Sequence, residues 1–413
     1  MKIEVDNVKG FTDYLPPESL KRAAIKKIVE ETYRLYGFAP VETPIIEYDE
    51  MMKPDMLPNE TEDEAVSDRF RLQDRASRNL GLRYEFTFQL AKIFKLNPNI
   101  KLPFRRYQIG EQFRDEPIRA GRTRQFTQCD ADILGDSSLH ADAECLALAK
   151  EIFTKLGIKA EAHVNNRKLI DAIIESCEIT AKKQVLKEID KLDKIGEDNV
   201  KLNLKKYADS NQIITLFKLL NKDIDFFIEN GFEGAKELKE LGDLCKIHGF
   251  VIKIRPTLVR GFSYYTGNVF EFMTDAKYAI AGGGRYDKTV GKFLNREIPA
   301  VGISFSIEAI MGLCSDEVSK LETSSLADVI VISIGKERDA IKLTSKLRKE
   351  GISVITMFDK PGKAIEYANV QQIRNVIFIG EKEAMKKKFT LRNMSSGKES
   401  LLAEKSLIAA LKK

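Results

Sequence analysis

In this chain of 413 residues, regular alternation of strand and helix is confined to the C-terminal part, which limits the possible folds. After a polar segment near residue 320, the sequence runs ADVIVISIG, ERDAIKLTSKLRKEG, ISVITMF, GKAIEYANVQQI and NVIFIG. This pattern predicts a small, separate α/β domain of the βαβ type. Upstream, strand-like runs such as LGLRYEFTF, FRRYQIGEQF, FTQCDADILG, SYYTGNVFEFM and YAIAGGGRYD lack that alternation. They favour an antiparallel sheet flanked by helices, an α+β fold.

A further change of pattern interrupts the upstream part. Residues 167–246 are helical in pattern, rich in lysine and poor in glycine, and strand-like segments resume after them. We therefore expect one domain formed by residues 1–166 and 247–320, a helical insertion at 167–246 and a C-terminal domain at 326–413. The eight lysines from Lys182 to Lys206 could contact nucleic-acid phosphates or simply form a solvated surface.

Composition excludes several classes of function. No run of about eighteen apolar residues could span a bilayer, and no apolar signal segment opens the sequence, so we expect a soluble cytoplasmic protein without membrane contact. The five cysteines are scattered without a C-x-x-C pair, as expected of reduced thiols, and with only three histidines a zinc site is not expected. A net charge of +5 permits an anionic partner but equally fits a mixed, solvated surface.

An unusual density of arginine follows Phe113, in the stretch FRDEPIRAGRTRQFTQCDADILG. The planar guanidinium group binds two phosphate oxygens at once and stays charged, so a polyphosphate or a nucleic acid would explain the cluster. Alternatively, the arginines pair with neighbouring carboxylates. The arginines are Arg114, Arg119, Arg122 and Arg124, and the acids are Asp115, Glu116, Asp130 and Asp132.

Two further segments combine glycine, arginine and tyrosine. In LVRGFSYYTGNVFEF, Arg260 precedes the pair Tyr264 and Tyr265. In AIAGGGRYDKTVGKF, three consecutive glycines would let the backbone approach a ligand closely, although they also suit a turn or a β-bulge. Each segment alone is weak evidence, because paired tyrosines are common in half-buried sheets.

In their order, the segments GFTDYLPPE, VETPIIE, LRYEFT, FRDEPIRAGRTRQFTQCDADILG, LVRGFSYYTG, AGGGRYD and PAVGISFSIE resemble the histidyl-tRNA synthetases, a family of class II aminoacyl-tRNA synthetases. FTQCDADILG and VNNRKLID look most like the archaeal and eukaryotic branch. The C-terminal unit resembles that family's anticodon-binding domain. The resemblance implies the class II antiparallel sheet and ATP-dependent attachment of histidine to histidine tRNA through a histidyl-adenylate, with Mg²⁺ on the ATP phosphates. It also implies a homodimer, since the helix from Glu18 and the strand at Pro44 resemble motif 1, which builds the two-fold interface.

The resemblance also assigns roles to individual residues. The catalytic residues would be Arg260 and Arg114, acting on the α-phosphate from opposite sides. The ATP-binding residues would be Arg114, Glu116 and Arg122. The histidine-binding residues would be Glu85, Thr87, Gln128, Asp132, Arg260, Tyr264, Tyr265 and Gly283.

Two positions depart from the family pattern. Ala309 stands where motif 3 usually carries an arginine, and Arg285 or Lys288 could take over part of that role. Ser263 stands where an aspartate is usual. The departures leave room for a non-catalytic paralogue that serves as regulatory subunit of the ATP phosphoribosyltransferase of histidine biosynthesis, or for a domain that senses uncharged tRNA. The retained Arg260 and the C-terminal domain favour the synthetase.

Overall fold

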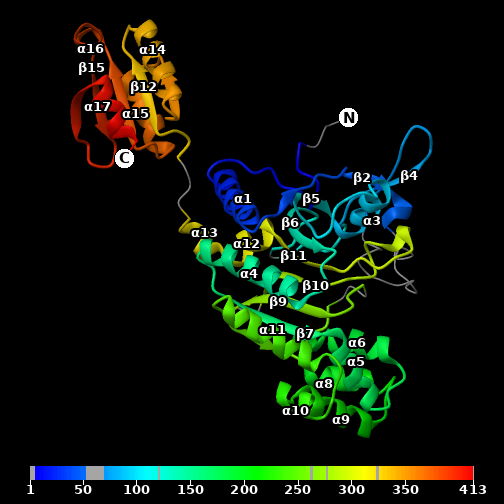
Figure 1. Cartoon of the computed structure of the whole chain (residues 1–413). Coiled ribbons are helices and arrows are strands. Elements are labelled where there is room, and N and C mark those ends of the chain that lie inside the picture. Colours follow the sequence, from blue (N-terminus) through cyan, green and yellow to red (C-terminus); the bar gives the residue numbers. More distant parts are fainter. Residues whose placement is uncertain are drawn as a thin grey trace. The chain divides into compact units, whose positions relative to one another are not determined.

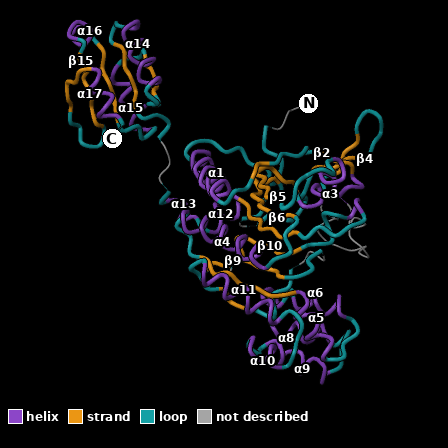
Figure 2. Tube along the Cα trace, in the orientation of Figure 1, coloured by secondary structure: helices purple, strands orange, loops and turns teal. Residues whose placement is uncertain are grey.

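The computed structural model describes residues 5–52, 69–119, 121–260, 264–275, 278–321 and 325–412. They belong to two compact units, Met1–Leu321 and Glu322–Lys413, whose elements are labelled in Figure 1 and coloured by secondary structure in Figure 2. The two units share no sheet and have separate buried cores, so each is described separately.

The first unit is built on an eight-stranded sheet with the order β1-β5-β6-β11-β10-β9-β7-β8. All neighbouring strands are antiparallel except the two edge pairs, β1 with β5 and β7 with β8. This confirms the predicted antiparallel α+β fold. The strands are β1 (Ala39–Pro40), β5 (Phe104–Phe113), β6 (Gln125–Leu134), β7 (Ala160–Asn166), β8 (Ile252–Ile254), β9 (Asn268–Thr274), β10 (Ala279–Arg285) and β11 (Ala300–Ser306).

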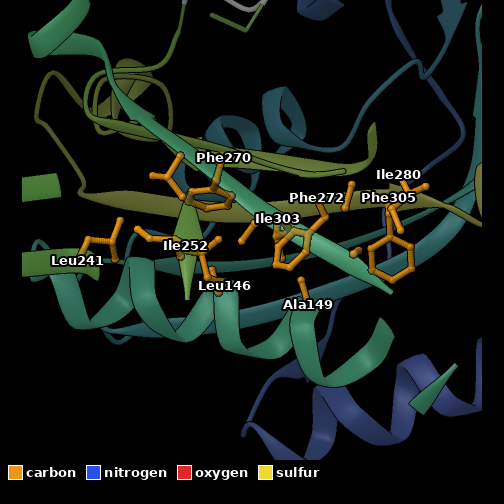
Figure 3. Close-up of a cluster of buried hydrophobic side chains, with 14 of the residues drawn as sticks. Leu146, Ala149, Leu241, Ile252, Phe270, Phe272, Ile280, Ile303 and Phe305 are labelled. Carbon is orange, nitrogen blue, oxygen red and sulfur yellow. The ribbon is translucent and has the colours of Figure 1, made fainter. Parts of the chain in front are cut away.

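One face of this sheet packs against helices, with α4 (Leu139–Lys155) across its centre (Figure 3). Alternate strand residues point to the same face, so Phe272 on β9 and Phe305 on β11 both meet Phe153 of α4, with ring centroids 5.3 and 5.6 Å apart. Burying each such ring contributes about 1.5–3 kcal/mol. Leu146 and Ala149 of α4 lie in the same cluster. The intervening strand residues are thereby directed to the opposite face.

The remaining helices of the first unit lie around the sheet. They include α1 (Glu18–Leu35), η1 (Asp49–Met52), α3 (Thr87–Leu96), η3 (Lys292–Leu294), α12 (Ile307–Leu313) and α13 (Ser315–Ser319). A second, three-stranded sheet has the order β2 (Ile46–Tyr48), β4 (Asn79–Leu82) and β3 (Arg71–Gln73). The run LGLRYEFTF, expected to be a strand, is extended only up to Leu82. Helix α3 begins five residues later because Glu85 accepts the backbone N–H groups of Thr87 and Phe88.

The region between β7 and β8 is helical. Its helices are α5 (Arg167–Ser176), α6 (Lys182–Ile189), α7 (Leu192–Ile195), α8 (Glu197–Leu204), α9 (Ser210–Leu220), α10 (Ile224–Glu229) and α11 (Ala235–Ile247). Several of its lysines pair with nearby acids, as Lys191 does with Glu188 at 2.8 Å and Lys194 with Asp190 at 3.4 Å. Pairs of this kind near the surface contribute little stability, and they favour the solvated-surface interpretation of these lysines.

The second unit has a five-stranded sheet with the order β13-β12-β14-β15-β16. Strand β12, which lies between β13 and β14, is buried on both faces, because Val331 packs toward α14 and α17 while Ile332 packs toward α15. Antiparallel strands β15 and β16 extend the predicted βαβ unit. The elements are β12 (Val329–Ser333), α14 (Glu337–Lys349), β13 (Val354–Met357), α15 (Pro361–Val370), β14 (Asn375–Ile379), α16 (Glu381–Lys386), β15 (Lys388–Asn393), β16 (Glu399–Ala403) and α17 (Glu404–Leu411).

Candidate active site

A cleft that is open to solvent lies against the sheet residues that alternate with the helix-packed ones. On β11, Ile303 packs into the core while Ser304 lines the cleft, and on β9 Phe272 is in the core while Glu271 lines the cleft. The predicted site residues that line the cleft are Glu85, Thr87, Arg114, Glu116, Arg122, Gln128, Arg260, Tyr264 and Tyr265. The fold thus brings together residues that are up to 180 positions apart in the sequence.

Arg114 and Arg122 approach the cleft from the loop between β5 and β6. The Arg114 guanidinium is oriented by donation from Nε to the carbonyl oxygen of Tyr84 at 3.0 Å, and it lies 5.2 Å from the centre of the Phe126 ring. Its Nη1 is 3.6 Å from Glu116, and Nη1 of Arg122 is 3.1 Å from the same carboxylate. Two cations therefore share one counter-ion at the cleft, where a phosphate group could bind.

Arg260 reaches the cleft from the segment that follows β8. Its Nη1 lies 3.3 Å from the carbonyl oxygen of Phe270 and 3.4 Å from Glu271. A Cβ atom on Gly282 would lie 1.4 Å from the same nitrogen. The glycine in the middle of β10 therefore provides the space that the guanidinium occupies, so the role of at least this glycine is steric rather than conformational.

Glu85 is a buried carboxylate beside the start of α3. It accepts the backbone N–H groups of Thr87 and Phe88, both at 2.6 Å. Burial nevertheless raises the pKa of Glu85, and these hydrogen bonds only partly offset that effect. A cationic ammonium group entering the cleft would favour the charged form, so the position suits an amino-acid substrate. Tyr264 and Tyr265 line the same cleft, with their ring centroids 4.6 Å apart.

Asp132 and Gly283, both expected to bind histidine, do not line the cleft. The Asp132 carboxylate lies 2.6 Å from Nη2 of the fully buried Arg106, and it accepts a hydrogen bond from the Tyr286 hydroxyl. A Cβ atom on Gly283 would lie 2.0 Å from the carbonyl oxygen of Gly302, so this glycine allows close packing within the sheet.

Sequence reasoning assigned no site role to Asp130 or Glu271, although both line the cleft, as does Gly282 of the predicted glycine segment. Asp130 accepts a hydrogen bond from Gln128 at 2.8 Å. A signal for it was present, because polar and apolar residues alternate through QCDAD and place residues 128, 130 and 132 on one face of β6. On β9 the signal is different, because Glu271 is the one charged residue in the otherwise largely apolar strand NVFEFMT.

The pKa of Asp130 is raised to about 7, mainly by burial and further by the nearby Asp132, while Arg106 acts in the opposite direction. An aspartate in an unfolded chain has a pKa of about 3.9. The protonated native carboxyl therefore stabilises the fold fully below pH ~4, and this stabilisation is lost as pH rises toward 7.

We predict that Asp130→Asn reduces the dependence of the unfolding free energy on pH between about 4 and 7. One proton bound only by the native state gives a slope of at most about −1.4 kcal/mol per pH unit, and asparagine cannot bind that proton. Urea unfolding of both proteins at several pH values in this range would measure the slopes. Identical slopes would contradict the assignment of this titration to Asp130.

The structure corrects the expectation that Arg285 or Lys288 could replace the arginine missing at residue 309. Arg285 cannot stand in for an arginine at this position. Its Nε lies 3.1 Å from Asp142, and it donates to the carbonyl oxygens of Asp136 and Ser138 at 3.0 and 2.9 Å, away from the cleft lining. Lys288 is exposed and does not line the cleft either. Ala309 itself lines the cleft, whereas Ser263 lies outside the described residues.

Within the described residues, no group of three or more histidine, cysteine, aspartate or glutamate side chains is placed to hold a metal ion. The described helices also include none that is long and apolar enough to cross a membrane.

An antiparallel sheet that carries a cleft lined by arginines, together with a separate α/β unit, is the architecture of the class II aminoacyl-tRNA synthetases. The family model for histidyl-tRNA synthetase matches residues 10–310, and that for the anticodon binding domain matches residues 328–413. The chain belongs to the histidyl-tRNA synthetase family, which confirms the resemblance seen in its motifs.

Individual relatives agree with this assignment. The chain is 37% identical to "Histidine--tRNA ligase 1" of Bacillus cereus, over 96% of this chain and 95% of that protein. It is 33% identical to "Histidine--tRNA ligase" of Finegoldia magna, over 99% of this chain and 100% of that protein. The structure is also similar to the crystal structure of histidyl-tRNA synthetase from Nostoc sp. PCC 7120, with a TM-score of 0.87 and 29% sequence identity. The superposition covers 100% of this chain and 99% of the Nostoc chain.

One solved structure has a title that includes the paralogue considered above. It is "an ATP phosphoribosyltransferase regulatory subunit/histidyl-tRNA synthetase" from Bacillus halodurans C, with a TM-score of 0.74 over 92% of this chain and 99% of its own. At 22% identity it shows a shared fold alone.

Proposed function

We propose that this chain attaches histidine to histidine tRNA in two steps, with ATP as the second substrate, in the cytoplasm. The observation that carries the proposal is the convergence of Arg114, Arg122 and Arg260 on one cleft whose lining includes the buried carboxylate Glu85. Three guanidinium groups suit a polyphosphate, and a buried carboxylate suits the ammonium group of an amino acid. Nearly full-length relatives carry the name histidine--tRNA ligase, which supports the same substrates.

In the first step, an oxygen of the histidine carboxylate bonds to the α-phosphorus of ATP while the bond to the bridging oxygen breaks and pyrophosphate leaves. Negative charge on the α-phosphate oxygens would be neutralised by Arg114 and Arg260. Both guanidiniums are oriented before substrate arrives, by the carbonyl oxygens of Tyr84 and Phe270. Glu85 and Gln128 would hold the amino acid in line for attack.

In the second step, a hydroxyl of the terminal adenosine of the tRNA attacks the carbonyl carbon of the adenylate, and AMP leaves. Arg122, on the loop at the edge of the cleft, would face the ATP phosphates or the tRNA end. We propose that Mg²⁺ arrives on the ATP phosphates, since the cleft carboxylates Glu116 and Glu271 already face arginines.

The test is histidine-dependent ATP/pyrophosphate exchange by the purified chain, which follows the first step without tRNA. We expect exchange with histidine and none with other amino acids. Absence of exchange, with histidine binding still detectable by calorimetry, would overturn the synthetase proposal and favour the regulatory paralogue.

The homodimer is supported by an apolar face on the three-stranded sheet. Ile46 and Tyr48 are 49% and 51% exposed, and Leu72 is 39% exposed. Tyr48 and Leu72 are both paired with Leu80 on the strand between them, so these side chains share one face. Glu47 points to the other side and is buried. Adjacent apolar side chains of this kind mark an interaction surface.

We predict a mass near twice 46.8 kDa in sedimentation at micromolar concentration. The variant Tyr48→Asp should shift the population toward monomer, because a charge on this face would be desolvated in the dimer. A wild-type chain that sediments as a monomer would contradict the dimer proposal.

A further inference from the structure

The loop between β5 and β6 is a hairpin with a defined tip. Its base is closed by the backbone N–H of Arg114, which donates to the carbonyl oxygen of Arg124 at 2.8 Å. At the tip, Arg119 and Arg122 exchange two backbone hydrogen bonds of 3.1 and 2.8 Å, and Gly121 has a positive φ of 70°. The described part of the tip is therefore a tight turn whose backbone conformation at residue 121 favours glycine.

This tip lies directly on helix α12. A Cβ atom on Gly312 would be 3.0 Å from the backbone nitrogen of Gly121 and 3.1 Å from its Cα. In the other direction, a Cβ atom on Gly121 would be 3.3 Å from Cα of Ala309 and 3.1 Å from Cγ of Leu313. The backbone can approach so closely because residue 312 has no side chain and residue 309 has only a methyl group. Ala309, Gly312 and Leu313 are called the tip seat below.

Arg122 depends on this contact more than the other cleft arginines do. Arg114 and Arg260 donate to backbone carbonyl oxygens within the protein. The Arg122 side chain is 58% exposed and lies 3.1 Å from Glu116, which belongs to the same hairpin. Its direction into the cleft is therefore set mainly by where the tip rests.

We propose that the tip seat fixes the hairpin so that Arg122 binds the terminal phosphates of ATP, in place of an arginine at position 309. The inference rests on the proposed function and adds the residues that position Arg122. With Ala309 and Gly312, α12 carries no cation at these positions. Because both residues are small, the hairpin can pack against α12, and Arg122 can lie on this side of the cleft.

The test compares Gly312→Ala with Gly242→Ala in pyrophosphate exchange. Both glycines lie in helices, where alanine is favourable, but a Cβ at Gly242 meets only Ile252 at an ordinary 3.8 Å. Because the new methyl displaces the tip, we expect Gly312→Ala to raise the KM for ATP about tenfold and to leave the KM for histidine within twofold. Gly242→Ala should change neither constant.

A double variant separates positioning from general damage. Arg122→Ala should raise the KM for ATP by a similar factor, and Gly312→Ala combined with Arg122→Ala should lose little more than the larger single loss. If the wild-type chain shows histidine-dependent exchange, either of two results would overturn this inference. One is that the losses of the two single variants add in the double variant, and the other is that Gly312→Ala keeps the wild-type KM for ATP. A wild-type chain without histidine-dependent exchange would overturn the proposed function, and this inference with it.

Discussion

Arg260→Ala is expected to lower the kcat of histidine-dependent pyrophosphate exchange by about 100- to 1000-fold, with a much smaller effect on the KM for histidine. A preoriented cation that meets charge developing in the transition state contributes about 3–4 kcal/mol, and its loss falls mainly on kcat. The guanidinium is preoriented by the carbonyl oxygen of Phe270 and by Glu271, at 3.3 and 3.4 Å. Steady-state exchange rates at saturating histidine and ATP would measure the effect.

Two further variants make this expectation specific. Arg255→Ala removes an arginine five residues upstream that contacts Thr257 and Asp193 outside the cleft, and it should leave exchange within about twofold. Gly282→Ala keeps Arg260 but places a Cβ atom 1.4 Å from its Nη1, so the guanidinium must move and kcat should fall at least tenfold. Wild-type exchange in Gly282→Ala would show that the guanidinium acts from another position.

The strand pattern allowed much of the sheet to be predicted, because a strand buried on one face alternates in a way that local sequence displays. In β6, the apolar Cys129 and Ala131 alternate with Gln128 and Asp130, and this order alone separates the core face from the cleft face. The alternation does not show which polar residue on that face meets a substrate. That depends on the tertiary contacts of each residue: Asp130 lines the cleft, whereas Asp132 pairs with Arg106.

Other features depend on partners that are distant in sequence. In the sequence, Arg285 is a basic residue that could replace the missing arginine, but its partner Asp142 lies 143 positions earlier, in the first turns of α4. Likewise, the sequence shows at residue 309 only the absence of an arginine, whereas the structure shows the contact of Ala309 with the loop near Gly121. No local pattern encodes such contacts, because they depend on which strands and helices become neighbours. The residue types limit the chemistry, and the topology decides which of them can take part.

Removal of residues 327–413 is expected to reduce tRNA charging about 100-fold while pyrophosphate exchange stays within about threefold. A 100-fold loss corresponds to about 3 kcal/mol of binding to tRNA. Exchange should persist because the cleft residues all belong to the first unit, which keeps its own core around Phe153, Phe272 and Phe305. The removed part has separate cores, with Val331 in one and Ile332 in the other.

Aminoacylation with histidine tRNA and pyrophosphate exchange would be measured on the same preparations, together with thermal unfolding of the truncated chain. The control is the full chain with Ile334→Ser, since this second-unit residue is 49% exposed and its replacement should leave the fold intact. Selective loss of charging would assign tRNA affinity to the C-terminal unit. Equal loss in both assays would instead mean that this unit stabilises the first one or its dimer, because a unit that only binds tRNA has no part in adenylate formation.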